Sequence, residues 1–230
     1  MKANSNADER LRLIAKGYYI AKSTLIKEGY AAEVDWQYEV SLRDLDESTF
    51  LREAAWVILS SGMRETVIRQ KFSDISEAFF DWASAGRIVE HADLCTARAA
   101  DHFRHQAKLA AIVTVAAHVS QQGFSRVVEN VRNNGIEYLQ QLPYMGPATS
   151  CHLAKNIGLP LSKPDRHLLR LANKLGYINP HQLCVDIATV TDDAIPVIDI
   201  VLWRYSTLYS HYIDRFATLF PPTGTQARST

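Results

Sequence analysis

Apolar residues recur every three or four positions through most of the chain, which is the spacing of one helix face. This period predicts ten helices, over residues 8–28, 47–59, 63–72, 73–86, 95–120, 127–134 and 147–156, after Asp165, and over 180–187 and 195–212. Asp46, Asn179 and the pair Asp192-Asp193 stand where helices begin, and their side chains are good N-terminal caps. Residues 29–46 lack the period and predict an extended connection, with a short strand as the alternative.

No Asn-Gly turn joins two alternating runs, and no internal repeat with a fixed period is found. Both observations argue against a sheet protein and against a solenoid. The expected fold class is therefore all-α, with roughly ten helices by the count of periodic segments.

The composition is that of an ordinary globular domain, with 47% hydrophobic and 22% charged residues in 230. Formal net charge is zero, so charge as a whole gives no argument for a polyanionic partner. Charge is nevertheless uneven along the chain. Residues 139–180 contain five basic side chains and a single carboxylate, Asp165; the basic ones are Lys155, Lys163, Arg166, Arg170 and Lys174.

Three cysteines, Cys95, Cys151 and Cys184, lie far apart and form no Cys-x-x-Cys pair. They supply too few ligands for a zinc site or an iron–sulfur cluster, so we expect buried or half-buried thiols and no metal. The sequence shows neither a signal peptide nor an apolar run that would span a membrane. We therefore expect a cytoplasmic, bacterial or nucleoid-associated protein without a membrane partner.

The stretch 139–170 has the clearest chemistry in the chain. It predicts a tight hairpin at 142–146, a helix that starts at Pro147, and a further helix that starts after Asp165. Pro147 suits the first turn of a helix because its missing N–H has no partner there in any case. Helix starts present unpaired N–H groups that bind phosphate, and a lone carboxylate stands beside them. This combination indicates nucleic-acid chemistry.

The motifs Leu-Pro-Tyr-Met-Gly at 142–146 and Lys-Pro-Asp-Arg-His at 163–167 resemble those of the helix–hairpin–helix DNA glycosylases. In that superfamily, which includes endonuclease III and the adenine glycosylases, a Leu-Pro-Gly-hydrophobic-Gly hairpin precedes an Asp that opens the next helix. Residues 56–64, Trp-Val-Ile-Leu-Ser-Ser-Gly-Met-Arg, resemble the family's buried helix and the wedge-bearing turn after it. The resemblance implies a two-lobed helical fold with the active site between the lobes.

The implied organisation has five parts. Residues 1–45 form an N-terminal helix and a connection that pack on the second lobe, and 46–135 form a helical lobe with the wedge turn. Residues 136–176 carry the helix–hairpin–helix and the catalytic Asp, 177–215 form C-terminal helices, and 216–230 form a disordered tail.

Two departures from the family pattern define the expected reaction. Tyr144 replaces the first Gly of the hairpin, and Ala148 replaces the Lys that forms a Schiff base in the strand-cleaving branch. The family's four-cysteine cluster is absent as well. The resemblance therefore implies a monofunctional glycosylase without a cofactor, apart from a structural monovalent cation at the hairpin.

Asp165 is the expected catalytic residue. Breaking a base–sugar bond builds positive charge on C1′ and the ring oxygen, and a fixed carboxylate stabilises that charge or orients the attacking water. The alternative is that Asp165 only caps its helix, which is worth ~1 kcal/mol. The two roles are compatible.

The other expected contacts fall into three groups. Residues expected to bind DNA through the hairpin or through side chains are Tyr144, Met145, Gly146, Ala148, Thr149, Lys155, Arg166, His167 and Arg170. Met63 or Arg64 is the expected wedge that fills the gap left by a flipped nucleotide. Glu53, Trp56, Asp199 and Trp203 are candidates for a base pocket. For each of these, core packing or a solvated helix face is the alternative.

The leading hypothesis is a monomeric, monofunctional DNA glycosylase that acts on a damaged or modified base in double-stranded DNA. Because Ala148 clears space, a bulky base such as hypermodified cytosine is one candidate substrate. Alkylated purines, oxidised guanine and mispaired adenine are others, and the role is either DNA repair or phage defence. Two alternatives remain: a glycosylase with lyase activity that uses another amine, such as Lys155 or Lys163, and a helix–hairpin–helix module that only binds DNA.

Overall fold

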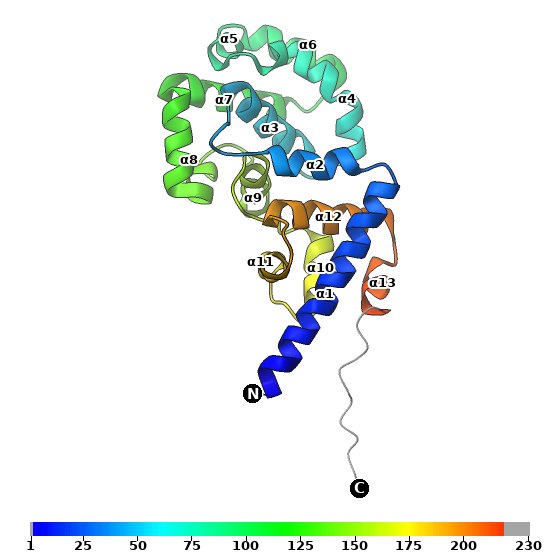
Figure 1. Ribbon diagram of the computed structural model, residues 1–230. Coiled ribbons are helices and arrows are strands. Elements are labelled where there is room, and N and C mark those ends of the chain that lie inside the picture. The colour runs from blue at the N-terminus through cyan, green and yellow to red at the C-terminus, as the bar shows by residue number, and fades with distance from the viewer. Residues whose placement is uncertain (1, 219–230) are drawn as a thin grey trace. The chain divides into compact units, whose positions relative to one another are not determined.

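Helices make up all the regular structure of the part of the chain that the computed structural model describes. That part comprises the backbone of residues 2–218 and the side chains of residues 8–216. It contains thirteen α-helices, one short 3-10 helix and no strand, which confirms the all-α class (Figure 1). The number of helices exceeds the expected ten, because tertiary packing breaks some of the periodic segments and creates a helix where none was expected.

The chain divides into two structural units, Met1–Glu39 with Pro160–Thr230 as unit 1 and Val40–Leu159 as unit 2. This division differs from the expected one: the boundary at 159/160 falls between the hairpin and Asp165, which were expected in one segment. The helices of unit 1 are α1 (Lys2–Lys27), α2 (Ala31–Glu39), α10 (Arg166–Lys174), α11 (Pro180–Val190), α12 (Ile195–Leu208) and α13 (Tyr212–Thr218). Those of unit 2 are α3 (Glu47–Ser60), α4 (Glu65–Ala78), η1 (Phe80–Trp82), α5 (Ala85–Glu90), α6 (Ala92–His102), α7 (Gln106–Gln122), α8 (Phe124–Leu139) and α9 (Pro147–Asn156).

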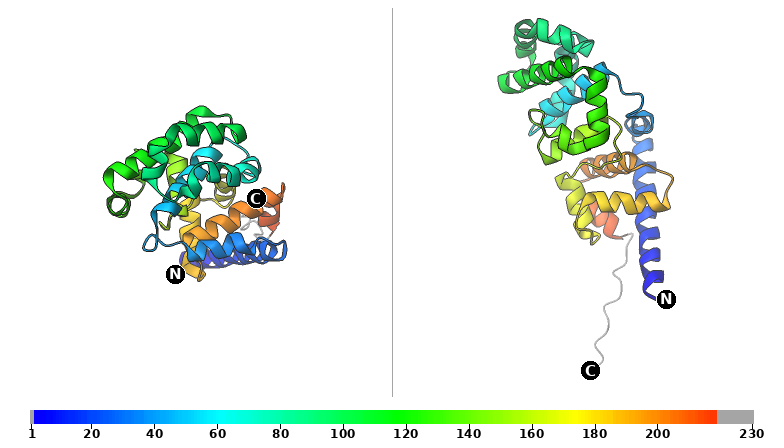
Figure 2. Two further views of the ribbon diagram at one scale, coloured as in Figure 1. Left: turned by 90° about the horizontal axis from the view of Figure 1, so that it is seen from above. Right: turned by 90° about the vertical axis from the view of Figure 1, so that its left-hand side faces the viewer.

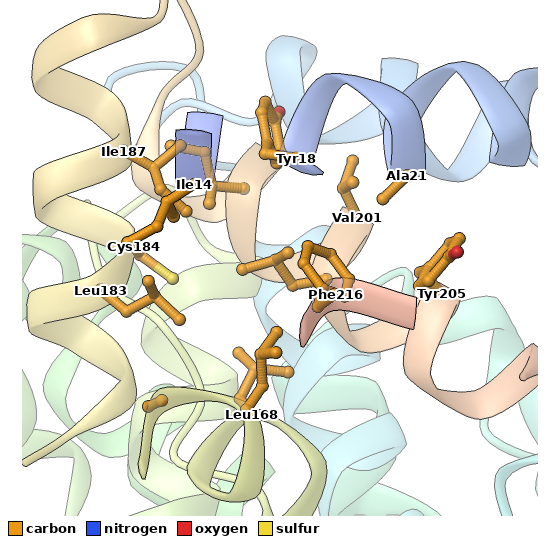
Figure 3. Close-up of a cluster of buried hydrophobic side chains, with 14 of the residues drawn as sticks. Ile14, Tyr18, Ala21, Leu168, Leu183, Cys184, Ile187, Val201, Tyr205 and Phe216 are labelled. Carbon is orange, nitrogen blue, oxygen red and sulfur yellow. The ribbon is translucent and has the colours of Figure 1, made fainter. Parts of the chain in front are cut away.

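Unit 1 is built around α12, which packs against α1, α2, α10, α11 and α13 (Figures 1 and 2). Its apolar residues Val197, Ile198, Val201 and Leu202 are at most 1% exposed. Figure 3 shows side chains of this core, with Ile14 of α1 beside Ile187 of α11 and Ala21 of α1 beside Val201 of α12. Of the predicted helical period of α1, Ile14, Ala15, Tyr18 and Leu25 are buried, whereas Tyr19 and Ile26 are exposed.

Unit 2 is centred on α3 and α7, which pack against each other. Both carry continuous buried apolar faces, and α3 also packs on α4 and α9. The N-terminal cap of α3 is Asp46, as predicted, whose carboxylate accepts a hydrogen bond from the Thr49 amide at 2.6 Å. A Cβ at Gly158 would lie 2.3 Å from the Leu42 amide nitrogen, so only glycine allows the chain after α9 to pack on the segment before α3.

Several expected elements are corrected by tertiary packing. Residues 31–39, expected as a connection, form α2, because Val34 and Gln37 lie one turn apart and are buried. The expected helix 95–120 breaks into α6 and α7 at Phe103, which is extended and buried. Helix α8 runs to Leu139, past the expected stop, with a kink at Gly135. Helix α1 begins at Lys2 rather than at residue 8.

The expected helices 63–72 and 73–86 form one helix, α4, followed by a left-handed turn. Phe80, Asp81 and Trp82 all have positive φ, a conformation that L-residues avoid. The turn is held because Trp82 stacks on Phe79 with ring centroids 5.2 Å apart and its indole N–H donates to Ser76 at 3.0 Å. In the expected tail 216–230, Phe216 is buried on α13, and residues 219–230 lie outside the described part.

Asp193 has a different role from the predicted cap of the last helix. Helix α12 starts after Ala194 without a side-chain cap, and the Asp193 carboxylate instead accepts hydrogen bonds from Tyr18, Lys22 and Tyr38. Burial alone would raise the pKa of Asp193, but these three donors hold that pKa below its usual value. Burial and the same carboxylate raise the pKa of Tyr18. The network joins α1 and α2 to the start of α12.

We expect Asp193→Asn to lower the free energy of unfolding at neutral pH by about 2 kcal/mol, because one charged acceptor serves three donors. A depressed carboxyl pKa contributes stability above about pH 4 that is lost as the pH falls further. Urea unfolding from pH 7 to pH 3 should therefore show a weaker pH dependence in Asp193→Asn than in the wild type. The matched control is Asp192→Asn, at an exposed carboxylate one residue away. Equal losses in both variants would contradict the prediction.

Candidate functional site

The hairpin in unit 2 has the form that its sequence predicts. The Met145 amide donates to the Leu142 carbonyl at 3.2 Å and closes the turn, and Pro147 occupies the first turn of α9. No side chain caps α9, so the amides of Gly146, Ala148 and Thr149 remain available at its exposed start. The structure thereby removes one expected contact, because the Met145 amide is used in the turn and its side chain is buried.

Tyr144 keeps the backbone conformation that a glycine would adopt in the hairpin. Its φ is 62°, in the left-handed region, which costs a non-glycine residue about 1 kcal/mol or more. The Thr149 hydroxyl donates to the Tyr144 carbonyl at 2.6 Å and helps to hold the turn. Tyr144 therefore places an aromatic ring on a backbone conformation that glycine adopts without strain.

The wedge turn between α3 and α4 lies close to the hairpin within unit 2, and Lys108 of α7 joins them. The Lys108 ammonium donates to the carbonyls of Leu59, at 2.8 Å, and Ser61, where α3 ends. The same ammonium lies 5.8 Å from the ring centroid of Tyr144. Burial lowers the pKa of Lys108, which is 3% exposed. This one cation therefore connects the two elements that sequence reasoning assigned to DNA contact.

Both expected wedge residues, Met63 and Arg64, are exposed in this turn. Met63 lines a surface hollow of about 550 Å³ together with Phe103, Arg104, His105 and residues of α4. His105 packs its ring edge against Tyr144, with centroids 6.5 Å apart. The hollow is large enough for a nucleobase.

Glu53 is buried in unit 2, between α3 and the end of α9. Its carboxylate accepts a hydrogen bond from the side-chain amide of Asn156 (Nδ2) at 2.8 Å and forms an ion pair with Arg52 at 3.0 Å. Burial raises the pKa of Glu53, while the nearby Arg52, Asn156 and Lys155 oppose that rise. Lys155, expected to bind phosphate, is 4% exposed, and its charge acts on Glu53.

Trp56 takes part in an aromatic cluster of unit 2. Its ring meets Phe72 edge-on with centroids 5.1 Å apart, and Arg69 lies 5.6 Å from its centroid. Trp56 and Glu53 therefore have different neighbours, α4 for the first and α9 for the second. The other two base-pocket candidates, Asp199 and Trp203, belong to unit 1.

Asp165 is the N-terminal cap of α10 in unit 1. Its Oδ1 accepts from the amides of His167, at 2.8 Å, and Leu168, at 3.0 Å. Oδ2 accepts no hydrogen bond from the described residues, and the side chain is half-buried. The cap is therefore confirmed, and it engages one of the two carboxylate oxygens.

Asp199 fixes the loop that leads to Asp165. Its carboxylate, 2% exposed on α12, accepts a hydrogen bond from the Lys163 amide at 2.7 Å. The Asp165 amide in turn donates to the Lys163 carbonyl at 2.8 Å. Asp199 thus holds the backbone beside the candidate catalytic residue, which is a different task from lining a pocket. Trp203, one turn further along α12, lies under the guanidinium of Arg204, 4.6 Å from its ring centroid.

Tyr212 of α13 also supports the start of α10. Its hydroxyl donates to the His167 carbonyl at 3.1 Å, and their rings lie 5.9 Å apart. Burial raises the pKa of Tyr212, and the charges of Arg170 and Asp165 act on it in opposite directions. The Nδ1 atom of His167 is buried and has no hydrogen-bond partner among the described residues. Such an atom is unusual and marks a place where a ligand or water completes the bonding.

Exposed basic residues follow one face of α10 from Asp165 onward. Arg166, Arg170 and Lys174 are exposed and four residues apart, opposite the buried Leu168 and Leu171. Eight residues of helix span about 12 Å, so the stripe is long enough to meet successive phosphates of one strand.

Three residues of these sites were missed by sequence reasoning: Lys108, His105 and Tyr212. A signal was present for Lys108, a single lysine at the start of the apolar run 107–119. No comparable signal marked His105 or Tyr212, whose roles come from neighbours distant in sequence.

The hairpin carbonyls that would hold a monovalent cation accept internal hydrogen bonds. Thr149 donates to Tyr144 and Ser150 to Gly146, each through a side-chain hydroxyl. The Tyr144 and Gly146 carbonyls therefore each have a hydrogen-bond donor within the hairpin. Over the described residues, no group of three or more His, Cys, Asp or Glu side chains is arranged to hold a metal ion. Cys95 and Cys184 are buried and Cys151 is half-buried, as expected.

Comparison with known protein families and with curated proteins finds no match for this chain. Among the described helices, none is both long enough and apolar enough to cross a membrane.

Because burial raises the pKa of Glu53, its ionised form is costly at neutral pH. We expect Glu53→Gln to raise the free energy of unfolding at pH 8, because glutamine keeps the shape of the side chain and removes the costly buried charge. A raised carboxyl pKa means that the wild type loses stability as the pH rises, so this advantage should vanish below about pH 4. Urea unfolding at both pH values, with the exposed Glu129→Gln as control, tests this. A variant less stable than the wild type at pH 8 would contradict it.

Proposed function

We propose that this chain is a monofunctional DNA glycosylase that hydrolyses the N-glycosidic bond of a damaged or modified base and leaves an abasic site. The observation that carries the proposal is Asp165. Its Oδ1 is engaged by the first amides of α10, its Oδ2 has no hydrogen bond from the described residues, and its backbone is fixed through Asp199. A carboxylate that is held in place through one oxygen can stabilise, through the other, the positive charge that develops on a sugar ring.

Two sets of groups that could bind phosphate support DNA as the partner: backbone N–H groups in unit 2 and basic side chains in unit 1. In unit 2 the uncapped start of α9 offers backbone N–H groups to a phosphate without sequence preference. In unit 1 the stripe formed by Arg166, Arg170 and Lys174 begins at the candidate catalytic residue. His167 Nδ1, which has no hydrogen-bond partner among the described residues, can donate to or accept from a water in the same place.

The proposed reaction is an addition of water across the C1′–N bond. As the bond to the base lengthens, positive charge develops on C1′ and O4′, and Asp165 Oδ2 stabilises that charge. A water then bonds to C1′ as its proton passes to the Asp165 carboxylate, and the departing base takes up a proton from solvent or from a donor of its pocket. Met63 or Arg64 of the wedge turn fills the space that the flipped nucleotide vacates.

Asp165→Asn tests the catalytic proposal. The side-chain oxygen of asparagine still accepts the capping hydrogen bonds, while the substitution removes the negative charge. The assay uses duplexes that carry alkylated purines, oxidised guanine, mispaired adenine or hypermodified cytosine. For the duplex that the wild type cleaves, we expect the rate of base release to fall about 100-fold or more in Asp165→Asn. Abasic sites are measured as alkali-labile breaks. Asp165→Ala should in addition lose about 1 kcal/mol of stability with its cap.

The matched control is Asp192→Asn, an exposed carboxylate of the same unit, which should cleave like the wild type. Unchanged release by Asp165→Asn would exclude Asp165 as the catalytic group. Salt-sensitive DNA binding with no base release from any of these duplexes would favour the alternative of a module that only binds DNA.

The alternative with lyase activity requires an amine that attacks C1′ and forms a Schiff base. The residue two positions after Gly146 is Ala148, and Lys155 is buried beside Glu53. We therefore expect borohydride to trap no covalent protein–DNA adduct during turnover. A trapped adduct that disappears in Lys163→Met or in Lys155→Met would instead support the lyase.

A further inference from the structure

The ring of Tyr144 is exposed on a backbone conformation that glycine would adopt without strain. Its φ is 62°, and 37% of the residue is accessible to solvent. The ring is nonetheless fixed: His105 packs against it edge-on with centroids 6.5 Å apart, and the Lys108 ammonium lies 5.8 Å from its centroid. Its hydroxyl makes no hydrogen bond with the described residues.

Strained residues persist where the surroundings hold them, and they concentrate at sites of function. Folding does not explain a tyrosine here, because the ring is partly exposed and a glycine would relieve the strain. A hydroxyl with no protein partner does not explain it either. The aromatic surface, held in a fixed orientation on a hairpin with unpaired amides next to it, is the feature that remains.

The surroundings of the ring indicate the kind of partner. Lys108 and His105 are next to it, and His105 borders the same hollow as the exposed Met63 of the wedge turn. An aromatic ring beside basic groups and beside phosphate-binding amides is the combination by which proteins hold unpaired nucleotides, because every base has a face for stacking.

We propose that Tyr144 stacks on a nucleobase that is unpaired when the target nucleotide is extruded, next to the phosphate held by the hairpin. The inference rests on the proposed function and assigns to the Tyr144 side chain a task that is separate from the chemistry at Asp165. The hairpin then contributes two contacts, its backbone to the phosphate and Tyr144 to the base. Since stacking tolerates any base, the contact stabilises the opened strand without selecting a sequence.

The test uses the full chain and a duplex that carries a stable abasic-site analogue, with the fluorescent base 2-aminopurine opposite the analogue. Wild-type protein should quench 2-aminopurine on binding, because stacking on an aromatic ring quenches its emission. Tyr144→Phe should bind and quench like the wild type. Tyr144→Gly should bind about tenfold more weakly, equivalent to 1.4 kcal/mol, and should lose the quenching at saturation.

Tyr144→Gly should also have a melting temperature no lower than that of the wild type, since the strain at this position is removed. The matched control is Tyr19→Leu, which deletes another exposed tyrosine, 45% accessible on α1, and should leave binding and quenching unchanged. Circular dichroism confirms that each variant is folded at the temperature of the binding assay.

Three outcomes would overturn the proposal. Equal binding and quenching by Tyr144→Gly and wild type would exclude the stacking role, while the proposed glycosylase would stand on the Asp165 result. A loss in Tyr144→Phe as large as that in Tyr144→Gly would assign the contact to the hydroxyl. Absence of DNA binding by the wild type would reject the stacking proposal and the proposed function together.

Discussion

The hydrogen bond from the Lys163 amide to the buried Asp199 carboxylate fixes the backbone that leads to the candidate catalytic residue. Burial of a polar group is costly unless a partner compensates it, and the Lys163 amide is such a partner for Asp199. The Lys163 carbonyl accepts a hydrogen bond from the Asp165 amide, and Asp165 Oδ1 accepts one from the His167 amide at the start of α10. With Tyr212 holding the His167 carbonyl from α13, the first turn of α10 is supported from two other helices. The proposed hydrolysis at C1′ would benefit from such a fixed carboxylate, because a mobile one would have to be ordered in the transition state at a cost in entropy.

Unit 2 has a comparable constraint in Lys108. Its ammonium is buried and stays hydrogen-bonded to the C-terminal carbonyls of α3, where the helix dipole also favours a cation. Through that ammonium the position of the wedge turn and the position of the Tyr144 ring depend on each other. The two proposed tasks of unit 2, filling a gap in the duplex and holding an unpaired base, therefore share one support. Neither task requires the Asp165 carboxylate of unit 1, so substitutions of Tyr144 and of Asp165 are expected to separate base stacking from chemistry.

Local sequence signals predicted much of this. Helical periodicity gave the class, Pro147 and Asp46 marked true helix starts, and the hairpin and the Asp165 cap formed where their residue types favour them. What failed depended on contacts between distant residues. Asp193 has the chemistry of a cap but is used by Tyr18, Lys22 and Tyr38, and Phe103 breaks an apolar run because its ring is buried. Lys155 looked like a phosphate ligand because burial has no local signature, and the role of Lys108 depends on α3 and on a hairpin more than thirty residues away in sequence.

We propose hydrolysis of a glycosidic bond by a carboxylate-assisted water, without strand cleavage. The measurement that tests this most sharply incubates the protein with duplexes that carry single modified bases and identifies the products by mass spectrometry. We expect a free base and an intact strand that carries an abasic site. Strand scission with an unsaturated sugar end, or no free base from any duplex, would contradict it.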